Sequence, residues 1–335
     1  HYLKENNVSR VFKDNNGGYW FMTLNDGVYY LPLKEVSYIK TGGEEGVLSI
    51  AVDTLGKRFF LGLTDGSVSE YRYKNSHLRR KEIYEHSGNN FYSLLYNYST
   101  ESLLIGISDL IDYLPYYKNG KIAYMKSYST GGYRSMMFDK GKFYGAGSYG
   151  ITMFNYKNEE DKYSTYLKKE ERIWCTDIVK YNEKLWVGSK EGVRILSKGK
   201  LHNPFIGNKY LSSAITSMAL LTSETLLIGT KNFGILILTG DSIITRISDK
   251  DGLVSRFVKS LHIDSEGTIW AGTNKGLSRI DYHSKDDFTV KNISSNHGLI
   301  SVEINAICSS RDTIYLGTPK GLIQFDKTKV KTNTI

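Results

Sequence analysis

The chain has 335 residues, of which 40% are hydrophobic and 24% charged, with 32 glycines but only 4 prolines. This composition is typical of a folded protein and excludes disorder, and no apolar stretch reaches the roughly 18 to 20 residues that span a bilayer. The net charge is +9. Because the lysines are scattered through expected turns and form no stripe interleaved with aromatic residues, we expect no nucleic-acid partner.

Strands are favoured over helices along the whole chain. The 26 tyrosines and 13 phenylalanines accompany short runs of isoleucine, valine and threonine, which are residues that prefer strands. The two cysteines, Cys175 and Cys308, lie 133 positions apart and have no zinc-type spacing. We expect two buried free thiols in strands.

A repeated unit runs through the sequence from its first residues to its last. Short apolar runs that end in a glycine or threonine turn recur in chain order at residues 19–31, 59–71, 103–114, 143–154, 185–196, 226–238, 258–281 and 304–326. Equivalent anchor positions in these runs are Phe21, Phe60, Leu104, Tyr144, Trp186, Leu227, Trp270 and Tyr315. The steps between anchors are 39, 44, 40, 42, 41, 43 and 45 residues.

A period of about 42 residues with several short strands in each unit is the period of a β-propeller blade. The clearest unit predicts strands at residues 258–263, 268–273, 277–280 and 287–293. We therefore predict an all-β protein, a β-propeller of four-stranded blades with seven or eight blades, since eight repeat units are counted. The expected domain is a single propeller over residues 1–335, which we expect to be a fragment of a longer protein. The alternative to eight blades is a seven-bladed ring, in which the eighth unit belongs to a neighbouring propeller.

The anchors and glycines of the repeat have a structural interpretation. The aromatic residue two positions before a glycine is a bulky group suited to packing blade on blade. The paired glycines allow a positive φ or a close backbone approach at the turn between the second and third strands. Residues 327–335 are barely long enough to form an outer strand of the last blade.

Two segments resemble the two-component regulator propeller repeat. They are DGLVSRFV with IDSEGTIWAGTNKGLSRID, at residues 251–258 and 263–281, and HGLISVEI with IYLGTPKGLIQFD, at residues 297–304 and 314–326. The opening segment at residues 11–32 is similar to a blade of sensor histidine kinases of that class. Strong copies cover about half of the chain, and the units between residues 46 and 156 depart from the pattern.

In that family such propellers form the periplasmic part of membrane sensor kinases, including hybrid two-component systems that respond to glycans. The resemblance therefore implies a non-catalytic domain that senses a small molecule or an oligosaccharide on the periplasmic side of the inner membrane. It also implies a homodimer, since histidine kinases signal as dimers, and membrane attachment only through other segments of the full-length protein. It carries no binding site with it, because the motif consists of fold residues.

Signatures of enzymes and metal sites are missing from the sequence. We find no H-E-x-x-H, no G-x-S-x-G and no Walker loop, and no histidines at metal spacing, so we expect no catalytic residue, no metal and no cofactor. The segment at residues 264–270, DSEGTIW, resembles the Asp-box that caps a propeller turn in sialidases, with a spacing one residue too long.

Candidate ligand contacts lie where the chain enters each innermost strand, because loops on a rigid scaffold are where propellers concentrate function. Aromatic faces stack on sugars, and cationic or amide groups supply directed hydrogen bonds. The candidates are Arg10, Tyr133, Arg134, Trp174, Arg256, Lys259 and Asn305. Trp174 is the most informative, since it is the one tryptophan outside the neighbourhood of an anchor.

Two other functions remain open from the sequence. A catalytic propeller, such as a lyase or a glycoside-processing enzyme, would show paired carboxylates or histidines about 6 to 10 Å apart near the axis. A pure interaction scaffold would show a flat apolar face without a pocket.

Overall fold

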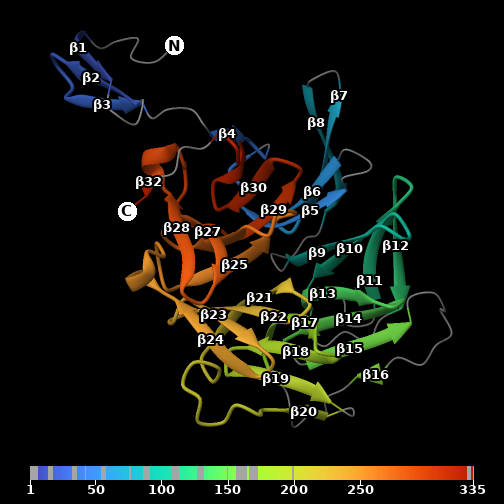
Figure 1. The fold of residues 1–335 in the computed structure, drawn as a ribbon. Coiled ribbons are helices and arrows are strands. Elements are labelled where there is room, and N and C mark those ends of the chain that lie inside the picture. The colour runs from blue at the N-terminus through green and yellow to red at the C-terminus, as the bar shows by residue number, and fades with distance from the viewer. Residues whose placement is uncertain are drawn as a thin grey trace.

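The computed structural model describes residues 7–13, 18–31, 36–41, 43–53, 58–74, 77–85, 91–107, 113–126, 132–148, 150–155, 164–165, 173–197, 200–329 and 333–334. Seven antiparallel sheets stand around a common axis, and a three-stranded sheet lies apart from them (Figure 1). No α-helix occurs in these described ranges. The prediction of an all-β propeller is therefore confirmed, and the ring has seven blades.

Each blade is named by its place in the chain and runs from an inner to an outer strand. Blade 1 contains β5 (Val47–Asp53), β6 (Arg58–Leu63), β7 (Val68–Lys74) and β8 (His77–Tyr84). Blade 2 contains β9 (Phe91–Asn97), β10 (Ser102–Ile107), β11 (Tyr113–Lys118) and β12 (Lys121–Lys126). Blade 3 contains β13 (Tyr133–Asp139), β14 (Lys142–Gly147), β15 (Gly150–Asn155) and β16 (Ser164–Thr165). Blades 4 and 5 are formed by β17 (Cys175–Tyr181), β18 (Lys184–Ser189), β19 (Gly192–Ser197) and β20 (Lys200–His202), and by β21 (Ile215–Thr222), β22 (Thr225–Thr230), β23 (Ile235–Thr239) and β24 (Ser242–Ile247).

The last two blades take strands from the chain ends. Blade 6 contains β25 (Val258–Ile263), β26 (Ile269–Thr273), β27 (Leu277–Ser284) and β28 (Asp287–Ile293), with β32 (Asn333–Thr334) paired to its outer edge. Blade 7 contains β29 (Ala306–Ser310), β30 (Thr313–Thr318) and β31 (Gly321–Asp326), and its fourth strand is β4 (Val36–Ile39).

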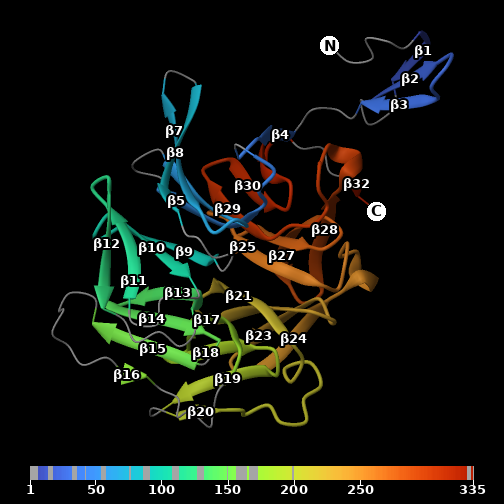
Figure 2. The ribbon, with the colours of Figure 1, turned by 180° about the vertical axis from the view of Figure 1, so that it is seen from behind.

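Strand β4 closes the ring, because it joins the blade formed last in the chain. Val36 pairs with Phe325, and Ile39 pairs with Leu322. Inner strand β29 of blade 7 then contacts inner strand β5 of blade 1, which completes the circle (Figure 2). The outer strand of the last blade thus comes from residues 36–39, and the two residues of β32 add to blade 6, where Lys291 pairs with Thr334.

All eight anchors of the repeat lie in the second strand of their sheets. Trp186, Trp270 and Tyr315 have alike surroundings, since each packs in a cluster that includes the inner strand of the following blade. The indoles of Trp186 and Trp270 are 0% and 1% exposed. Burial of such a side chain contributes roughly 2 to 3 kcal/mol from apolar area alone, so the anchors stabilise the junctions between blades.

The two glycines of each repeat have different roles. A Cβ on Gly272 would come within 2.4 Å of the Ser260 hydroxyl and 2.7 Å of Ile304 in the next blade, so this position is governed by close approach. Gly276, at the turn between β26 and β27, has φ +141°, a conformation that L side chains rarely adopt. Only the second glycine is needed for a positive φ.

A line of small residues in the inner strands, polar in all blades but the last, faces a glycine of the second strand in every blade except blade 3, where Ser135 pairs with Ala146. Ser260 pairs with Gly272, and Ser217 with Gly229. The seven equivalent positions are Ser49, Ser93, Ser135, Asp177, Ser217, Ser260 and Ala306. Because the hydroxyl occupies the space that a glycine Cβ would use, serine and glycine at these two positions belong together.

The two strongest family segments form the same local structure. Gly252 in DGL and Gly298 in HGL both end a single 3-10 turn with φ near +93°. The following residues, Leu253 and Leu299, are buried. The motif therefore turns the chain from an outer strand toward the next inner strand and fixes it with one leucine.

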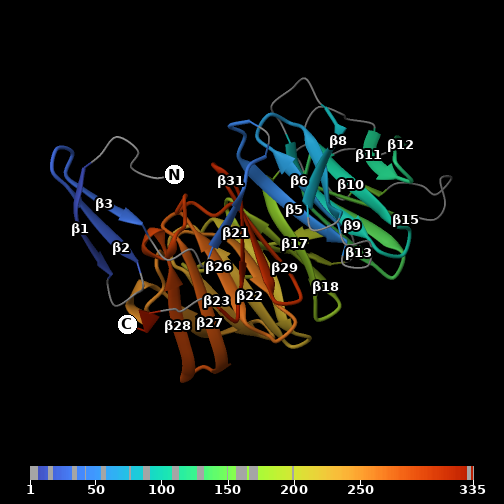
Figure 3. The ribbon, with the colours of Figure 1, turned by 90° about the horizontal axis from the view of Figure 1, so that it is seen from above.

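The first repeat unit forms the separate sheet, made of β1 (Val8–Lys13), β2 (Tyr19–Thr23) and β3 (Val28–Leu31). It stands away from the ring in all three views (Figure 3). Phe12, Leu24 and Val28 are more than half exposed. Whether residues 1–335 fold as one domain stays a prediction.

Candidate functional site

The start face of the ring, defined here as the face on which the seven inner strands begin, holds most of the predicted ligand contacts. The position that holds Ser49, Ser93, Ser135, Asp177, Ser217, Ser260 or Ala306 in the seven inner strands is called the serine position. The residues that directly precede it lie at equivalent places around this face. Three predicted residues are among these equivalents, which are Leu48, Tyr92, Arg134, Thr176, Thr216, Lys259 and Asn305. The repeat thus places Arg134, Lys259 and Asn305 on a single ring of positions.

Side chains from the inner strands connect every pair of neighbouring blades by a hydrogen bond. In blades 1 to 4 the residue that faces the second strand, Ser49, Ser93, Ser135 or Asp177, makes this hydrogen bond. For example, Ser93 Oγ donates to the Tyr133 carbonyl at 2.6 Å, and Ser135 Oγ donates to Asp177 Oδ1 at 2.6 Å. Asp177 in turn accepts a hydrogen bond from the backbone N–H of Met218 in blade 5 at 2.6 Å. Burial raises the pKa of this carboxyl group above its ordinary value.

In blades 5, 6 and 7 the hydrogen bond to the next blade is made by the residue just before the serine position. Thr216 Oγ1 donates to the Val258 carbonyl, Lys259 Nζ donates to Asn305 Oδ1 at 2.5 Å, and Asn305 Nδ2 donates to the Val47 carbonyl at 3.0 Å. Asn305 therefore joins the last blade to the first. The hydroxyls of Ser217 and Ser260, relieved of this role, are buried without a hydrogen-bond partner in the described part of the chain.

Lys259 and Arg256 are each held by a carboxylate on the same face. Lys259 Nζ pairs with Glu303 in addition to Asn305. Arg256 Nε lies 2.7 Å from Asp249 Oδ1, and this hydrogen bond lowers the pKa of the Asp249 carboxyl group. These predicted residues lie at the face, but their charges are balanced within the protein.

Tyr133 and Arg10 lie elsewhere. Tyr133 is 2% exposed and meets Phe143 edge to face at 5.4 Å, and its ring lies over Gly145. It is a core residue of blade 3, because its ring fills the space left by that glycine. Arg10 is exposed on β1 in the separate sheet, so the structure does not bring it to the start face.

Arg134 and Trp174 come together with a residue that the sequence did not single out, Lys190. The guanidinium carbon of Arg134 lies 4.3 Å from the centre of the Trp174 ring, and Lys190 Nζ lies 3.7 Å from it. At such distances a cation stands over the π-face of the ring. Trp174 is 40% exposed, so two cations and one accessible indole form a cluster at the start of blade 4.

Packing does not explain the size of Trp174. The backbone N–H of Lys190 donates to the Trp174 carbonyl, and in the next blade the N–H of Lys231 donates to the carbonyl of Ala214. These hydrogen bonds mark Trp174 and Ala214 as equivalent positions. Since alanine serves in blade 5, the fold requires only the backbone here, and the indole is available for another role.

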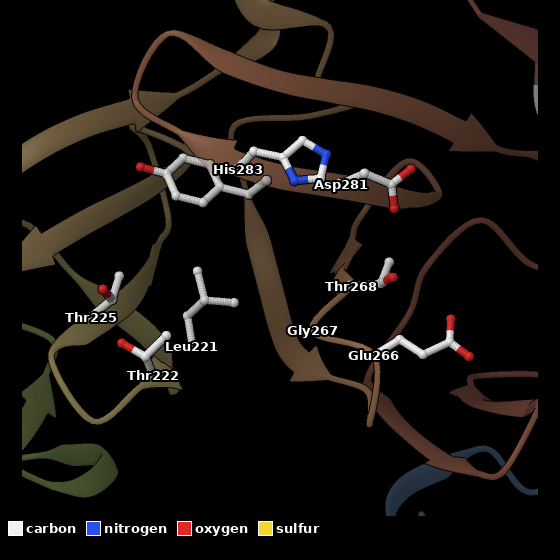
Figure 4. Close-up of a pocket in the computed structure, with 9 residues that line it drawn as sticks. Leu221, Thr222, Thr225, Glu266, Gly267, Thr268, Asp281 and His283 are labelled. Carbon is white, nitrogen blue, oxygen red and sulfur yellow. The ribbon is translucent and has the colours of Figure 1, made fainter.

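The opposite face has a pocket of about 370 Å³ between blades 5 and 6 (Figure 4). Its polar groups include Glu266, Asp281 and His283. Both carboxylates lie in ion pairs: Glu266 with Lys327 at 3.0 Å, and Asp281 with Arg279 at 3.1 Å. The pocket is therefore polar, but its acidic charges are already compensated.

Asp264 forms the turn beside this pocket, as its resemblance to an Asp-box implies. Its Oδ1 accepts from the backbone N–H groups of Glu266 and Thr268, and its Oδ2 accepts from Trp270 Nε1 and pairs with Lys327 at 3.1 Å. Burial alone would raise the pKa of Asp264, but these hydrogen bonds lower it. This carboxylate is structural, because it fixes the Trp270 anchor.

The free thiols are poor nucleophiles. Burial raises the pKa of the Cys175 thiol to about 12 and also raises that of Cys308, and the thiolate is the reactive form. Within the described ranges, no group of three or more histidine, cysteine or acidic side chains could hold a metal ion, and no helix is long and apolar enough to cross a membrane.

Comparison with known proteins shows what the chain is similar to. Residues 252–275 match the model of the two-component regulator propeller. The chain is 22% identical over 205 residues to "Histidine kinase P4" of Formosa agariphila, an alignment that covers 56% of this chain and 15% of the kinase.

Two solved structures share the fold. One is described as the extracellular domain of a hybrid two-component system, BT3049, of B. thetaiotaomicron, with a TM-score of 0.71 and 17% identity over 95% of this chain and 45% of that one. The other is the WD40 β-propeller domain of Doa1, with a TM-score of 0.68 and 14% identity over 88% of this chain and 96% of that one. The chain thus spans less than half of the two-component protein domain that it matches. The chain is therefore a β-propeller with one repeat that matches the two-component regulator propeller model, and over 205 residues it is similar to a histidine kinase.

Proposed function

We propose that this propeller is the extracytoplasmic ligand-sensing domain of a sensor histidine kinase, and that it recognises a small molecule or an oligosaccharide without chemical change. The similarity to a histidine kinase and to an extracellular domain of a two-component system supports this role. The aligned residues cover only 15% of that kinase, and we propose that a membrane segment and a kinase are supplied by other parts of a longer protein.

The observation that carries the proposal is the exposed cluster of Arg134, Trp174 and Lys190 on the start face. An accessible aromatic ring beside hydrogen-bond donors is the combination that binds sugars and other polar ligands. The ring of blades is held rigid by the connected inner strands, so a ligand at this face would act on the relative arrangement of two protomers more readily than on the blades. We propose a homodimer as the signalling form.

A panel of neutral and acidic oligosaccharides tested by isothermal titration calorimetry would test this function. We expect at least one member to bind, and Trp174→Ala to weaken that binding. Failure of every oligosaccharide would contradict the sugar version of the proposal. Light scattering with and without the bound oligosaccharide would test the dimer, and an unchanged monomer mass would contradict it.

A catalytic propeller receives less support from the structure. On the start face, Glu303 and Asp249 each pair with a cation, and the pocket carboxylates Glu266 and Asp281 do the same. Glycoside cleavage needs one carboxyl group that donates a proton and one that acts as base or nucleophile. Each of the four carboxylates is already engaged by a cation, so neither pair is free for these two roles.

A further inference from the structure

We infer that the hairpin of β7 and β8 in blade 1 binds a linear acidic polysaccharide along one of its faces. The hairpin forms the outer half of its blade, and its two strands extend beyond β5 and β6 (Figures 1 and 2). This surface is separate from the start-face cluster. The inference therefore goes beyond the proposed function and uses no residue of that cluster.

The register of the hairpin gathers its cations on one face. Positions 70, 72 and 74 of β7 pair with positions 81, 79 and 77 of β8. Side chains alternate between the two faces of a strand, and directly paired residues share a face. The basic face of the hairpin, as we define it, consists of Glu70, Arg72, Lys74, His77, Arg79 and Lys81.

Packing does not account for these cations. Arg72 and Arg79 lie directly opposite each other, and like charges at such positions repel and destabilise a sheet. The other face of the hairpin packs on the ring, where Tyr71 is buried and Tyr73 OH donates to Gln324 Oε1 of blade 7 at 3.1 Å. The fold uses that face, and the exposed cations are available for another role.

A buried carboxylate at the root of the hairpin balances the first of these cations. Glu70, whose side chain is 4% exposed, pairs with Arg72 at 2.5 Å and with Arg58 at 3.2 Å. Asp53 also pairs with Arg58, at 2.7 Å, so two carboxylates meet two arginines. Both oxygens of Glu70 are engaged, since Tyr117 OH donates to the second one at 3.1 Å. The root therefore has no negative charge left over for the other cations.

The other three cations, Lys74, Arg79 and Lys81, carry uncompensated positive charge. All three are exposed, and none forms an ion pair with a carboxylate in the part of the chain that the structure describes. The next residue of β8, Glu82, lies 3.5 Å from Arg80 instead. Cations of one sign that share a narrow surface add their fields and attract an anion together.

The shape and composition of the basic face fit a narrow anionic chain. Successive side chains on one face of a strand are about 7 Å apart, and the two rows lie about 5 Å from each other. This strip offers charge-assisted hydrogen bonds to the carboxylates of a linear polymer. Its side chains are all polar or charged, so it presents no apolar group to a bilayer and no aromatic ring to a nucleic-acid base.

The test uses octagalacturonate, a linear chain with a carboxylate on each ring, and its fully methyl-esterified form, which has the same rings without charge. Binding to the natural protein is measured by isothermal titration calorimetry. We expect the acid to bind more than about tenfold tighter than the ester at about 20 mM salt, and this difference to shrink at about 200 mM as salt screens the exposed charges.

Matched variants locate the surface. Lys74→Gln combined with Arg79→Gln should weaken binding of octagalacturonate by about tenfold, the size of two exposed charge contacts. Because this double variant also removes a like-charge pair, its melting temperature should equal or exceed that of the natural protein, which separates lost binding from lost folding. Lys275→Gln combined with Lys320→Gln is the control, since both lysines are exposed in turns of blades 6 and 7. It removes the same charge and should leave the affinity unchanged.

The outcomes distinguish this inference from its rivals. Equal weakening by the two double variants would show attraction to net charge alone and overturn the inference. Vesicles of phosphatidylglycerol whose binding is lost in the hairpin variant, while octagalacturonate still binds it, would assign the basic face to a membrane and also overturn the inference.

Trp174→Ala separates the basic face from the start face. Loss of octagalacturonate binding only in the hairpin variant supports the inference and leaves the proposed function to its own panel of oligosaccharides. Loss only in Trp174→Ala would support the proposed function and overturn the inference. Octagalacturonate that does not bind the natural protein at low salt would overturn the inference as well.

Discussion

The hydroxyl of Ser217 lies 2.5 Å from the point that a Cβ on Gly229 would occupy. These residues face each other across β21 and β22, and a serine faces a glycine in the same way in blades 1, 2 and 6. Because Val258 of blade 6 lies 2.9 Å from the same point, packing requires a glycine here both within blade 5 and between blades 5 and 6.

Gly229→Ala is therefore expected to lower the free energy of unfolding by about 1 to 3 kcal/mol, the usual cost of overpacking. The added methyl group would clash with Ser217 Oγ and with Val258 at 2.9 Å. Urea denaturation measures the loss. Ser217→Ala removes a buried hydroxyl that has no described partner, so alone it should be neutral or stabilising, and it should reduce the cost of Gly229→Ala. Purely additive effects would contradict this account.

The two buried anchor tryptophans form a natural comparison. Trp270 Nε1 donates to the Asp264 carboxylate at 3.1 Å, whereas Trp186 Nε1 has no partner among the described residues. Trp270→Phe should lower the free energy of unfolding by about 2 kcal/mol more than Trp186→Phe does. The reason is that Trp270→Phe removes a hydrogen bond to a charged group and leaves the buried carboxylate with one donor less. Equal losses in chemical denaturation would show that the Asp264 bond contributes nothing.

The stability of the protein should fall as the pH is lowered from about 6.5 to about 4. Burial lowers the pKa of His262 from 6.5 to about 4, although the charge of Asp264 acts in the opposite direction. The unfolded chain therefore takes up this proton before the folded protein does. Stability from neutral His262 is complete above pH 6.5 and is lost as the pH falls to about 4, by about 3 kcal/mol.

His262→Gln serves as the control for this titration. Urea denaturation at successive pH values should show a shallower fall for the variant in this window. His262 Nε2 lies 2.7 Å from Ser309 Oγ, and glutamine retains a polar group for that contact. A variant whose stability follows the same pH curve as the natural sequence would rule out His262 as the source.

Ring closure by β4 gives a prediction for shortened chains. Removal of residues 1–32 leaves β4 in place, and the melting temperature should stay within about 2 °C. Removal of residues 1–40 takes away the partner of β31 and the buried Val36. The melting temperature should then fall by about 5 to 10 °C, since roughly 3 kcal/mol of burial and pairing is lost. Equal melting curves for the two shortened chains would contradict closure by β4.

The repeat made most of the ring predictable from sequence. Phe60 and Leu104, whose units depart from the family motif, still lie in second strands, because the spacing alone places them. Ring closure was not predictable in this way. The four residues of β4 carry no repeat signal, and their partner β31 lies almost 290 positions away in the chain, so only the three-dimensional circle brings them together.

The candidate site was predictable in its parts but not in its assembly. Arg134 and Trp174 were expected at strand starts, yet their contact joins two blades 40 residues apart. Lys190 follows the glycine and serine of a turn, as Lys231 follows glycine and threonine in the next blade, so the sequence shows it only as a turn residue. Conversely, Tyr133 shares the same local pattern, and only the space above Gly145 reveals that it belongs to the core.

The central claim, recognition without chemistry, is tested most directly by mass spectrometry of a bound oligosaccharide recovered after long incubation with the propeller. The account predicts that the oligosaccharide returns with its mass unchanged at a concentration where calorimetry shows it bound. Recovery of shortened or unsaturated fragments, lost when the protein is heat-inactivated, would show that the propeller is an enzyme.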